Sequence, residues 1–160
     1  MELLNQKDIL KMSPWDFDQS PEGWRGVEAK EGRIKAAELI IKYMEVNKDS
    51  IDKDSKIVGK FMNFHVGQLL ASEGGENTGK SVPFFEQSFI NGKDCWNAYV
   101  SGTIAFLKGD VESVKSEIKV INNSESDKVS GNLPVLNNFL KVLMNGGGDY
   151  NTAYNMPRQM

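Results

Sequence analysis

The segment Gly74–Ser81 is the part of this sequence whose residue types and spacing most closely match a known chemistry. It reads GGENTGKS and satisfies the pattern G-x-x-x-x-G-K-[ST] of phosphate-binding loops. In such a loop, backbone N–H groups surround the phosphates of a nucleotide, while the lysine contacts the outer phosphates and the serine a magnesium ion. Lys80 and Ser81 would take these two roles, so one hypothesis is a small nucleotide-binding enzyme that uses this loop.

The residues on either side of Gly74–Ser81 argue against nucleotide binding. A phosphate-binding loop follows a buried β-strand, whereas the preceding residues 61–70 have the 3–4 apolar spacing of a helix. No later apolar run ends in an aspartate that would hold the metal, because the run 104–107 is followed by Lys108. We therefore expect this segment to form a turn between two helices.

Cys95 and His65 are the only thiol and the only imidazole in the chain. A cysteine and a histidine in contact can act as nucleophile and base, but their separation in the sequence does not require contact. The simpler interpretation is a cysteine packed as a small apolar side chain and a histidine in a groove or in the core. One histidine and one cysteine, without suitably spaced carboxylates, do not make a zinc site. We therefore expect no catalytic residue, no metal and no cofactor.

The overall composition excludes several classes of function. The 160 residues include 19 Lys and Arg and 22 Asp and Glu, which gives a net charge of −3. A protein that grips nucleic acid phosphates is expected to be basic. No apolar run approaches the roughly 18 residues of a membrane span, and the first twelve residues lack the basic and apolar parts of a signal peptide. We expect one cytoplasmic domain that binds neither nucleic acid nor membrane.

Apolar residues repeat mainly at helical spacing, and no alternating strand pattern of five residues stands out. Ser20 followed by Pro21 is typical of a helix start, and apolar positions between Ile34 and Met44 share one helical face. Residues 47–55 and 122–131 are polar and are predicted to be turn and loop, and the polar end from Asp149 on is expected to fray. Further helices are predicted over 54–73, 80–89, 95–108, 111–121 and 133–144.

Glycines recur in this helical region with a fixed period. Gly67 is followed seven residues later by Gly74, and Gly102 is followed seven residues later by Gly109, so the two pairs are 35 residues apart. A small residue within the first helix of a hairpin lets the second helix approach closely, and a glycine at the corner allows a sharp turn. A third corner follows at Gly148-Asp149-Tyr150.

The corner of glycine, aspartate and aromatic residue, followed by Ala153, resembles the tetratricopeptide repeats, whose period is about 34 residues. The resemblance covers about residues 54–154 and implies an all-α fold of stacked antiparallel helix hairpins, a tetratricopeptide-like superhelix. The turn Gly74–Gly79 is longer than the family uses, and Val114 stands where a small residue is expected. We expect one domain over 1–160, with an N-terminal helical cap (1–50), the hairpins (54–154) and a tail (155–160). An ordinary helical bundle with chance glycine spacing is the alternative.

In a tetratricopeptide-like stack, the first helix of each hairpin lines the concave face. The resemblance therefore implies a partner-binding face of seven residues, four of them aromatic: Phe61, Phe64, His65, Gln68, Trp96, Tyr99 and Thr103. Family members that bind acidic peptide ends carry a lysine, asparagine and arginine clamp at such positions, which this chain lacks, so an apolar helix or hydrophobic peptide fits better. Alternatively, the segment Trp15–Met44 folds into the groove, with Trp15 and Trp24 as buried anchors.

The sequence therefore favours a non-enzymatic helical-repeat module that binds a protein or peptide partner through this aromatic-lined concave face. Self-association is a further possibility, because a short array with an incomplete third repeat has an open end that another copy would cover. The nucleotide-binding enzyme is the alternative, and it requires turnover that depends on Lys80, Cys95 or His65.

Overall fold

The computed structural model describes residues 5–124 and 131–158, and all regular secondary structure in these ranges is helical. An all-α fold, as expected from the apolar spacing, is thus confirmed for the described chain. The helices are, in chain order, α1 (Gln6–Ile9), α2 (Pro14–Gln19), α3 (Trp24–Glu31), α4 (Arg33–Val46), α5 (Lys48–Asp54), α6 (Lys56–Glu73), α7 (Asn77–Glu86), α8 (Asp94–Leu107), α9 (Val111–Asn122), α10 (Asn132–Met144) and α11 (Tyr150–Tyr154).

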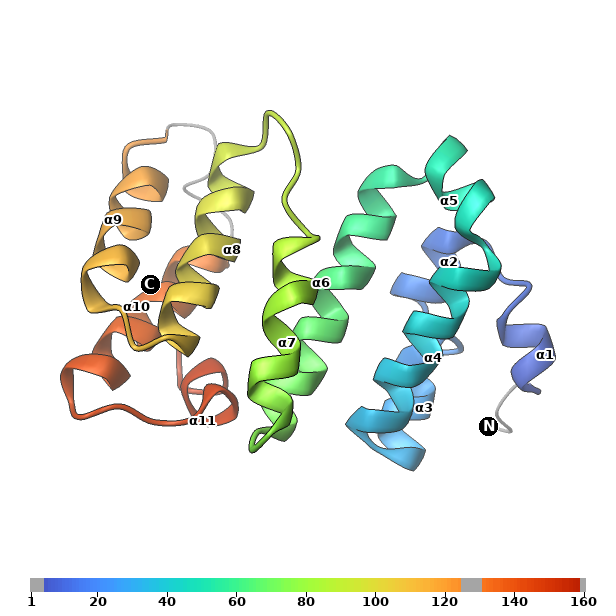
Figure 1. Cartoon of the computed structure of the whole chain (residues 1–160), viewed down its shortest axis with the longest axis horizontal. Helices are drawn as coiled ribbons and strands as arrows, with labels where there is room; N and C mark the ends of the chain where they lie inside the picture. The colour runs from blue at the N-terminus through green and yellow to red at the C-terminus, as the bar shows by residue number, and fades with distance from the viewer. Residues whose placement is uncertain (1–4, 125–130, 159–160) are drawn as a thin grey trace.

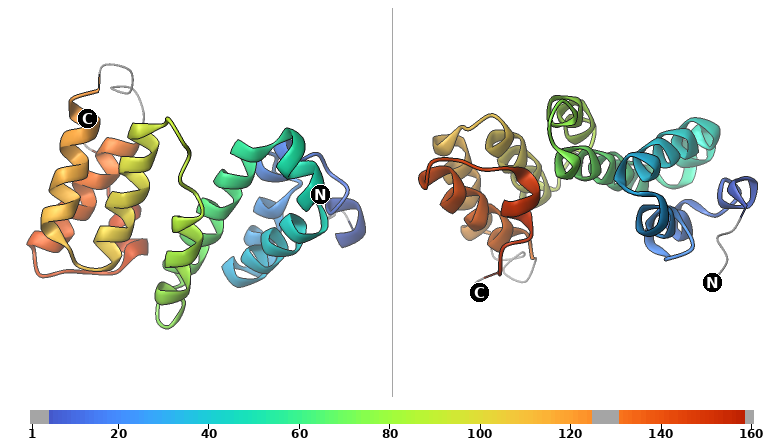
Figure 2. Two further views of the ribbon diagram at one scale, coloured as in Figure 1. Left: turned by 45° about the horizontal axis from the view of Figure 1, so that its top comes forward. Right: turned by 90° about the horizontal axis from the view of Figure 1, so that it is seen from below.

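The helices lie in a row along the long axis of the molecule, with the N-terminal helices at one end and the C-terminal helices at the other (Figure 1). The views in Figure 2 show α1–α5 as one group, α6 and α7 in the centre, and α8–α11 as the other group. The most extensive contacts are those of α6 with α7 and of α8 with α9, and α3 packs against α4. Helix α4 also packs against α6, and α10 packs against both α8 and α9.

Helix α6 has packing partners on two sides and connects two hydrophobic cores. Met62 and Val66 belong to the N-terminal core, where the rings of Phe17 and Tyr43 stack with centroids 3.8 Å apart. Phe64 belongs to the C-terminal core, which contains residues of α6–α11. A helix that buries apolar residues around most of its circumference needs a neighbour on each side. Side chains of α6 therefore face both halves of the molecule.

The apolar spacing located five of the helices with good precision. The ends of α6, α7, α8, α9 and α10 lie within three residues of the predicted ranges. Gly74 follows α6 with φ of 79° and Gly109 follows α8 with φ of 71°, and this left-handed conformation explains why glycine stands at these two corners. Part of the predicted loop 122–131, residues 125–130, lies outside the described residues.

The predicted helix start at Ser20 and Pro21 is wrong. Residues 21–23 form a turn, and α3 begins only after it. The serine–proline pair that does begin a helix lies earlier, where Ser13 accepts a hydrogen bond from the backbone N–H of Asp16 at 3.2 Å and Pro14 is the first residue of α2. A side-chain acceptor followed by proline suits the first turn of a helix, and only the earlier pair is used in this way.

The polar stretch 47–55, predicted as a turn, instead contains α5. Its only apolar residue, Ile51, is 6% exposed and packs against α6. The Cγ2 atom of Ile51 lies 2.7 Å from the position that a Cβ on Gly59 would occupy, so glycine is needed for this close approach. Burial of an isoleucine contributes roughly 1.5–3 kcal/mol, which stabilises a short helix that its polar composition alone does not favour.

Gly67 and Gly102, which lie 35 residues apart in the sequence, are both at helix contacts, but the contacts are of different kinds. A Cβ on Gly67 of α6 would lie 2.8 Å from the ring of Phe85 on α7, which is the close approach within a hairpin that the repeat predicted. A Cβ on Gly102 of α8 would lie 2.7 Å from Leu136 on α10, not from a residue of α9. Gly102 therefore allows the next helix pair to approach, and the prediction of a contact within its own hairpin is wrong.

Gly67→Ala is expected to lower the free energy of unfolding by about 1–2 kcal/mol. The added methyl group would overlap the fully buried ring of Phe85, and the better helix propensity of alanine offsets only part of that cost. The control is Gly79→Ala in α7, where no atom lies within 4 Å of the added methyl. Chemical denaturation followed by circular dichroism measures both variants. Equal stability of the two would show that α6 and α7 have room to separate.

Candidate functional site

Four of the seven residues predicted to line a binding face form one cluster of rings between α6 and α8. The ring centroids of Phe61 and Phe64 lie 5.1 Å and 4.9 Å from that of Trp96. The centroid of Tyr99 lies 5.3 Å from that of Phe64 and 6.1 Å from that of Trp96. These distances are typical of favourable aromatic pairs. The helical positions inferred from the sequence therefore do bring these aromatic residues together.

Most of this aromatic cluster is interior. Phe64 and Tyr99 expose only 3% and 4% of their surface, and Thr103 exposes none and donates its hydroxyl hydrogen to the Tyr99 carbonyl oxygen at 2.8 Å. Phe61 and Trp96 are half-buried, and the Trp96 indole N–H donates to a backbone carbonyl oxygen in the α7–α8 connection at 2.7 Å. Within the aromatic cluster, Phe61 and Trp96 are thus the rings that a partner would reach.

The C-terminal helix α11 packs against α6 and α10 next to this cluster. Tyr150 is 2% exposed, and its ring centroid lies 5.5 Å from that of Phe139, 6.4 Å from that of Phe85 and 6.5 Å from that of Phe106. Its hydroxyl oxygen accepts a hydrogen bond from the side-chain amide of Gln68 at 3.3 Å. Gln68, predicted as a partner-binding residue, thus binds a residue of the same chain.

The N-terminal half contributes a further contact to α11. Arg33 of α4 donates to the side-chain oxygen of Asn151 at 3.2 Å and to the Ser72 carbonyl oxygen at 3.4 Å, and it lies 3.8 Å from the Glu73 carboxylate. Helix α11 therefore contacts residues of α4, α6, α7, α8 and α10. Figure 1 shows it between the central and the C-terminal helices. We call the residues that hold it the α11 site: Arg33, Gln68, Phe85, Phe106 and Phe139.

The expectation that the chain frays from Asp149 on is wrong for α11. Asp149 accepts a hydrogen bond from the backbone N–H of Thr152 at 2.9 Å, which caps the helix, and Ala153 is fully buried. The ring of Tyr154 stacks on that of Tyr150 at a centroid distance of 5.6 Å. The motif of aspartate, tyrosine and later alanine, noted as a repeat corner, was the sequence signal for this helix.

The N-terminal segment packs on another side of α6. Trp24 is buried, as expected of an anchor, and its ring centroid lies 5.2 Å from that of His65. Trp15, the other expected anchor, is 60% exposed, so that part of the expectation is wrong. The segment therefore covers the side of α6 that carries His65, whereas α11 covers the side that carries Gln68.

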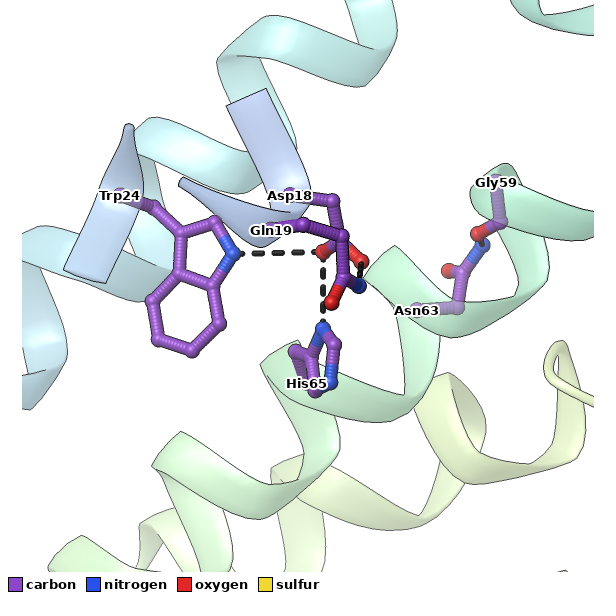
Figure 3. Close-up of polar contacts among 6 residues, drawn as sticks. All are labelled: Asp18, Gln19, Trp24, Gly59, Asn63 and His65. Carbon is purple, nitrogen blue, oxygen red and sulfur yellow. Dashed lines mark hydrogen bonds and ion pairs between the residues drawn. The ribbon is translucent and has the colours of Figure 1, made fainter. Parts of the chain in front are cut away.

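His65 takes part in a polar cluster that joins α2, α3 and α6 (Figure 3). Asp18 is fully buried, and its Oδ1 atom lies 2.8 Å from Nδ1 of His65 and 3.2 Å from the indole nitrogen of Trp24, which donates to it. Its other oxygen accepts a hydrogen bond from the side-chain amide of Gln19 at 2.6 Å. Three donors thus satisfy a carboxylate that would otherwise be costly to bury.

The pairing of Asp18 with His65 has the geometry that orients a catalytic base in hydrolases, but it lacks a nucleophile. With Nδ1 facing the carboxylate, Nε2 is the ring nitrogen that a nucleophile would have to contact. Over residues 5–124 and 131–158, no hydroxyl or thiol lies within hydrogen-bonding distance of His65. Cys95 packs against the C-terminal core instead, so the structure does not pair the chain's thiol with its imidazole. The contacts of His65 with Asp18 and Trp24 join α6 to α2 and α3.

Comparison of the chain with protein-family models, with curated proteins and with solved structures finds no match. The function is therefore inferred from the contacts of this chain's own residues.

Within the segment Gly74–Ser81, only residues 74–76 form the predicted turn, and Asn77–Ser81 are the first half of α7, so the turn is shorter than expected. Gly74 and Gly75 have positive φ angles, and α7 begins two residues later at Asn77. The Ser81 hydroxyl donates to the carbonyl oxygen of Thr78, inside the same helix. A helix and not a strand precedes the segment, so it lacks the context of a phosphate-binding loop.

Lys80→Ala is expected to leave the unfolding midpoint unchanged, because the side chain is exposed and pairs only with the exposed Glu76 at 3.5 Å. The same variant is expected to show no change in calorimetry with magnesium and ATP, since neither chain should bind the nucleotide. Tight binding by the unchanged protein that is lost in the variant would restore the nucleotide hypothesis.

The described part of the chain contains no group of three or more His, Cys, Asp or Glu side chains that could hold a metal ion. Among the helices of that part, none has the length and apolar character needed to cross a membrane.

Burial raises the pKa of three tyrosines and so predicts a loss of stability at high pH. Desolvation, with a smaller effect of Asp16, raises the pKa of Tyr43 to about 12, and desolvation also raises the pKa of Tyr99 and Tyr150. The unfolded chain loses these protons near the ordinary pKa of about 10, so stability is fully present below about pH 10 and falls as pH rises further. Denaturation at several alkaline pH values measures this. With Tyr150→Phe, the free energy of unfolding should fall less steeply as pH rises above about 10. An unchanged pH dependence would show that Tyr150 does not contribute to this loss of stability.

Proposed function

We propose that this chain is a non-enzymatic, tetratricopeptide-like helical-repeat module that binds a short, aromatic-bearing segment of a protein partner. The proposed binding surface comprises the half-buried rings of Phe61 and Trp96 and the adjoining α11 site. Phe64, Tyr99 and Thr103 support this surface from beneath.

The order of helix contacts supports a repeat arrangement. Helices α6 and α7, α8 and α9, and α10 and α11 form successive pairs. Each pair contacts the next, since α7 packs against α8, and α10 packs against both α8 and α9. Gly67 and Gly102 stand at equivalent positions of the 35-residue repeat, and each allows a close helix contact. Stacked pairs of this kind present extended surfaces that suit partner binding.

The observation that carries the proposal is that this face already holds a short helix, namely α11. A helix of only five residues is held by the buried side chains of Tyr150 and Ala153 and by two side-chain hydrogen bonds, Gln68 to Tyr150 and Arg33 to Asn151. Buried aromatic anchors of this kind provide most of the binding free energy at many protein interfaces. The α11 site thus has the chemistry needed to recognise a tyrosine on a helical segment.

Binding of a synthetic peptide in trans tests the proposal. The probe is a fluorescein-labelled peptide of residues 146–158, and its control is the same peptide with Tyr150→Ala. The receptors are the full wild-type chain and two full-length variants, Tyr150→Ala and Asn151→Ala, which weaken the hold on α11 and leave the α11 site itself intact. Fluorescence anisotropy measures the affinity, and circular dichroism shows which variants are folded.

We expect saturable binding of the probe to the folded variants, at least about tenfold tighter than to the wild-type chain, because the wild-type α11 competes at a roughly millimolar effective concentration. The control peptide should bind at least about tenfold more weakly than the probe, since it lacks the anchor. If Tyr150→Ala does not fold, the milder Asn151→Ala variant serves as the receptor in the binding measurement. Absence of saturable binding to either folded variant would overturn the proposal.

A further inference from the structure

The connection between α10 and α11 is a run of glycines. Gly146 and Gly147 have φ angles of 100° and 93°, and no atom lies within 4 Å of the position that a Cβ would occupy on either of them. The backbone N–H of Gly147 donates to the Val142 carbonyl oxygen at 3.0 Å, which closes the end of α10. Figure 1 shows the connection running along one edge of the molecule from the end of α10 to α11. A glycine connection of this kind can take other paths at little cost.

The two side-chain hydrogen bonds that hold α11 involve residues far away in the sequence. The bond from Gln68 to Tyr150 spans 82 residues, and the bond from Arg33 to Asn151 spans 118. None of these contacts depends on the path of the connection.

We propose that α11 exchanges between two copies of this chain, so that Tyr150 of each copy occupies the α11 site of the other. This inference rests on the proposed function, since it names a second copy as the partner that supplies the aromatic segment. Exchange keeps every contact of the α11 site and changes only the path of Gly146–Gly148, which makes it a low-cost route to a dimer. The wild-type chain favours its own α11 at micromolar concentration, because a short flexible connection gives a roughly millimolar effective concentration.

Shortening the connection tests the exchange on the full chain. Deletion of Gly146–Gly148 removes roughly 10 Å of reach, so that α11 no longer reaches its own site. Light scattering after size exclusion should then show a dimer at about 50 µM, well below the roughly millimolar effective concentration of the intact connection. The matched control carries the same deletion together with Tyr150→Ala, and it should be a monomer because it lacks the anchor.

A folded deletion variant that stays monomeric would overturn the exchange, as would a dimer that persists when Tyr150 is replaced. If the deletion variant does not fold, the same light-scattering measurement is made on the wild-type chain at about 1 mM. At that concentration the α11 of another copy competes equally with the chain's own α11 for the α11 site. A dimer that Tyr150→Phe retains would support the exchange, and a strictly monomeric wild-type chain would contradict it. Peptide binding to the α11 site without any dimer would refute only the exchange, whereas absence of peptide binding would refute the proposed function.

Discussion

Tyr150→Ala is expected to lower the free energy of unfolding by about 3–5 kcal/mol, the range measured for loss of a large aromatic side chain from a core. The ring is 2% exposed and contacts three phenylalanines from three different helices, so its removal leaves a cavity that closes only if these helices move toward one another. Loss of the ring also leaves the Gln68 amide without its acceptor. Denaturant titration followed by tryptophan fluorescence measures the change.

Two matched variants separate the contributions of Tyr150. Tyr150→Phe removes only the hydroxyl group and should cost about 0.5–1.5 kcal/mol, since it keeps the ring and loses one hydrogen bond. Tyr154→Ala removes the half-buried ring that stacks on Tyr150 and should cost less than Tyr150→Ala, because part of that ring is already in water. A Tyr150→Ala variant as stable as Tyr154→Ala would show that α11 contributes little to the fold.

Sequence patterns located the helices wherever apolar spacing and glycine stops agreed. Helix α6 shows both, with its apolar residues at 3–4 spacing and Gly74 directly after it. Helix α5 shows neither, because a single isoleucine among charged residues has no periodicity. Its stability comes from the contact of Ile51 with Gly59 of another helix, and single-sequence patterns do not contain such a contact.

The aromatic part of the candidate site was also predictable, because the positions of Phe61, Phe64, Trp96 and Tyr99 on two helices follow from the helical spacing of the apolar residues. What the sequence did not indicate is that the chain's own α11 occupies the adjoining site. Tyr150 stands among polar residues, and its burial depends on phenylalanines up to 65 residues earlier in the chain. The polar neighbours suggested a fraying end, whereas one ring and one small residue, Ala153, suffice to bury one face of a short helix.

Asp18→Ala is expected to destabilise the protein by about 2–4 kcal/mol, because it leaves buried donors without an acceptor. The Trp24 indole N–H loses its only partner in the described structure, and His65 loses the carboxylate 2.8 Å from its Nδ1 atom. Asp18→Asn keeps one acceptor oxygen and should cost less. Asp52→Ala is the matched control, since Asp52 pairs with Lys48 on the surface, where an ion pair contributes little to stability.

A double-mutant cycle with His65→Ala isolates the contribution of the Asp18–His65 contact. If the pair joins α2 to α6, the two substitutions should be non-additive by at least about 1 kcal/mol, because the second removes an interaction already lost. Differential hydrogen exchange adds a structural readout: loss of the pair should speed exchange in α2 and α3, while α8–α10 keep their protection. Additive effects, or faster exchange spread evenly over the chain, would show that the buried carboxylate is held by Gln19 and Trp24 without a contribution from His65.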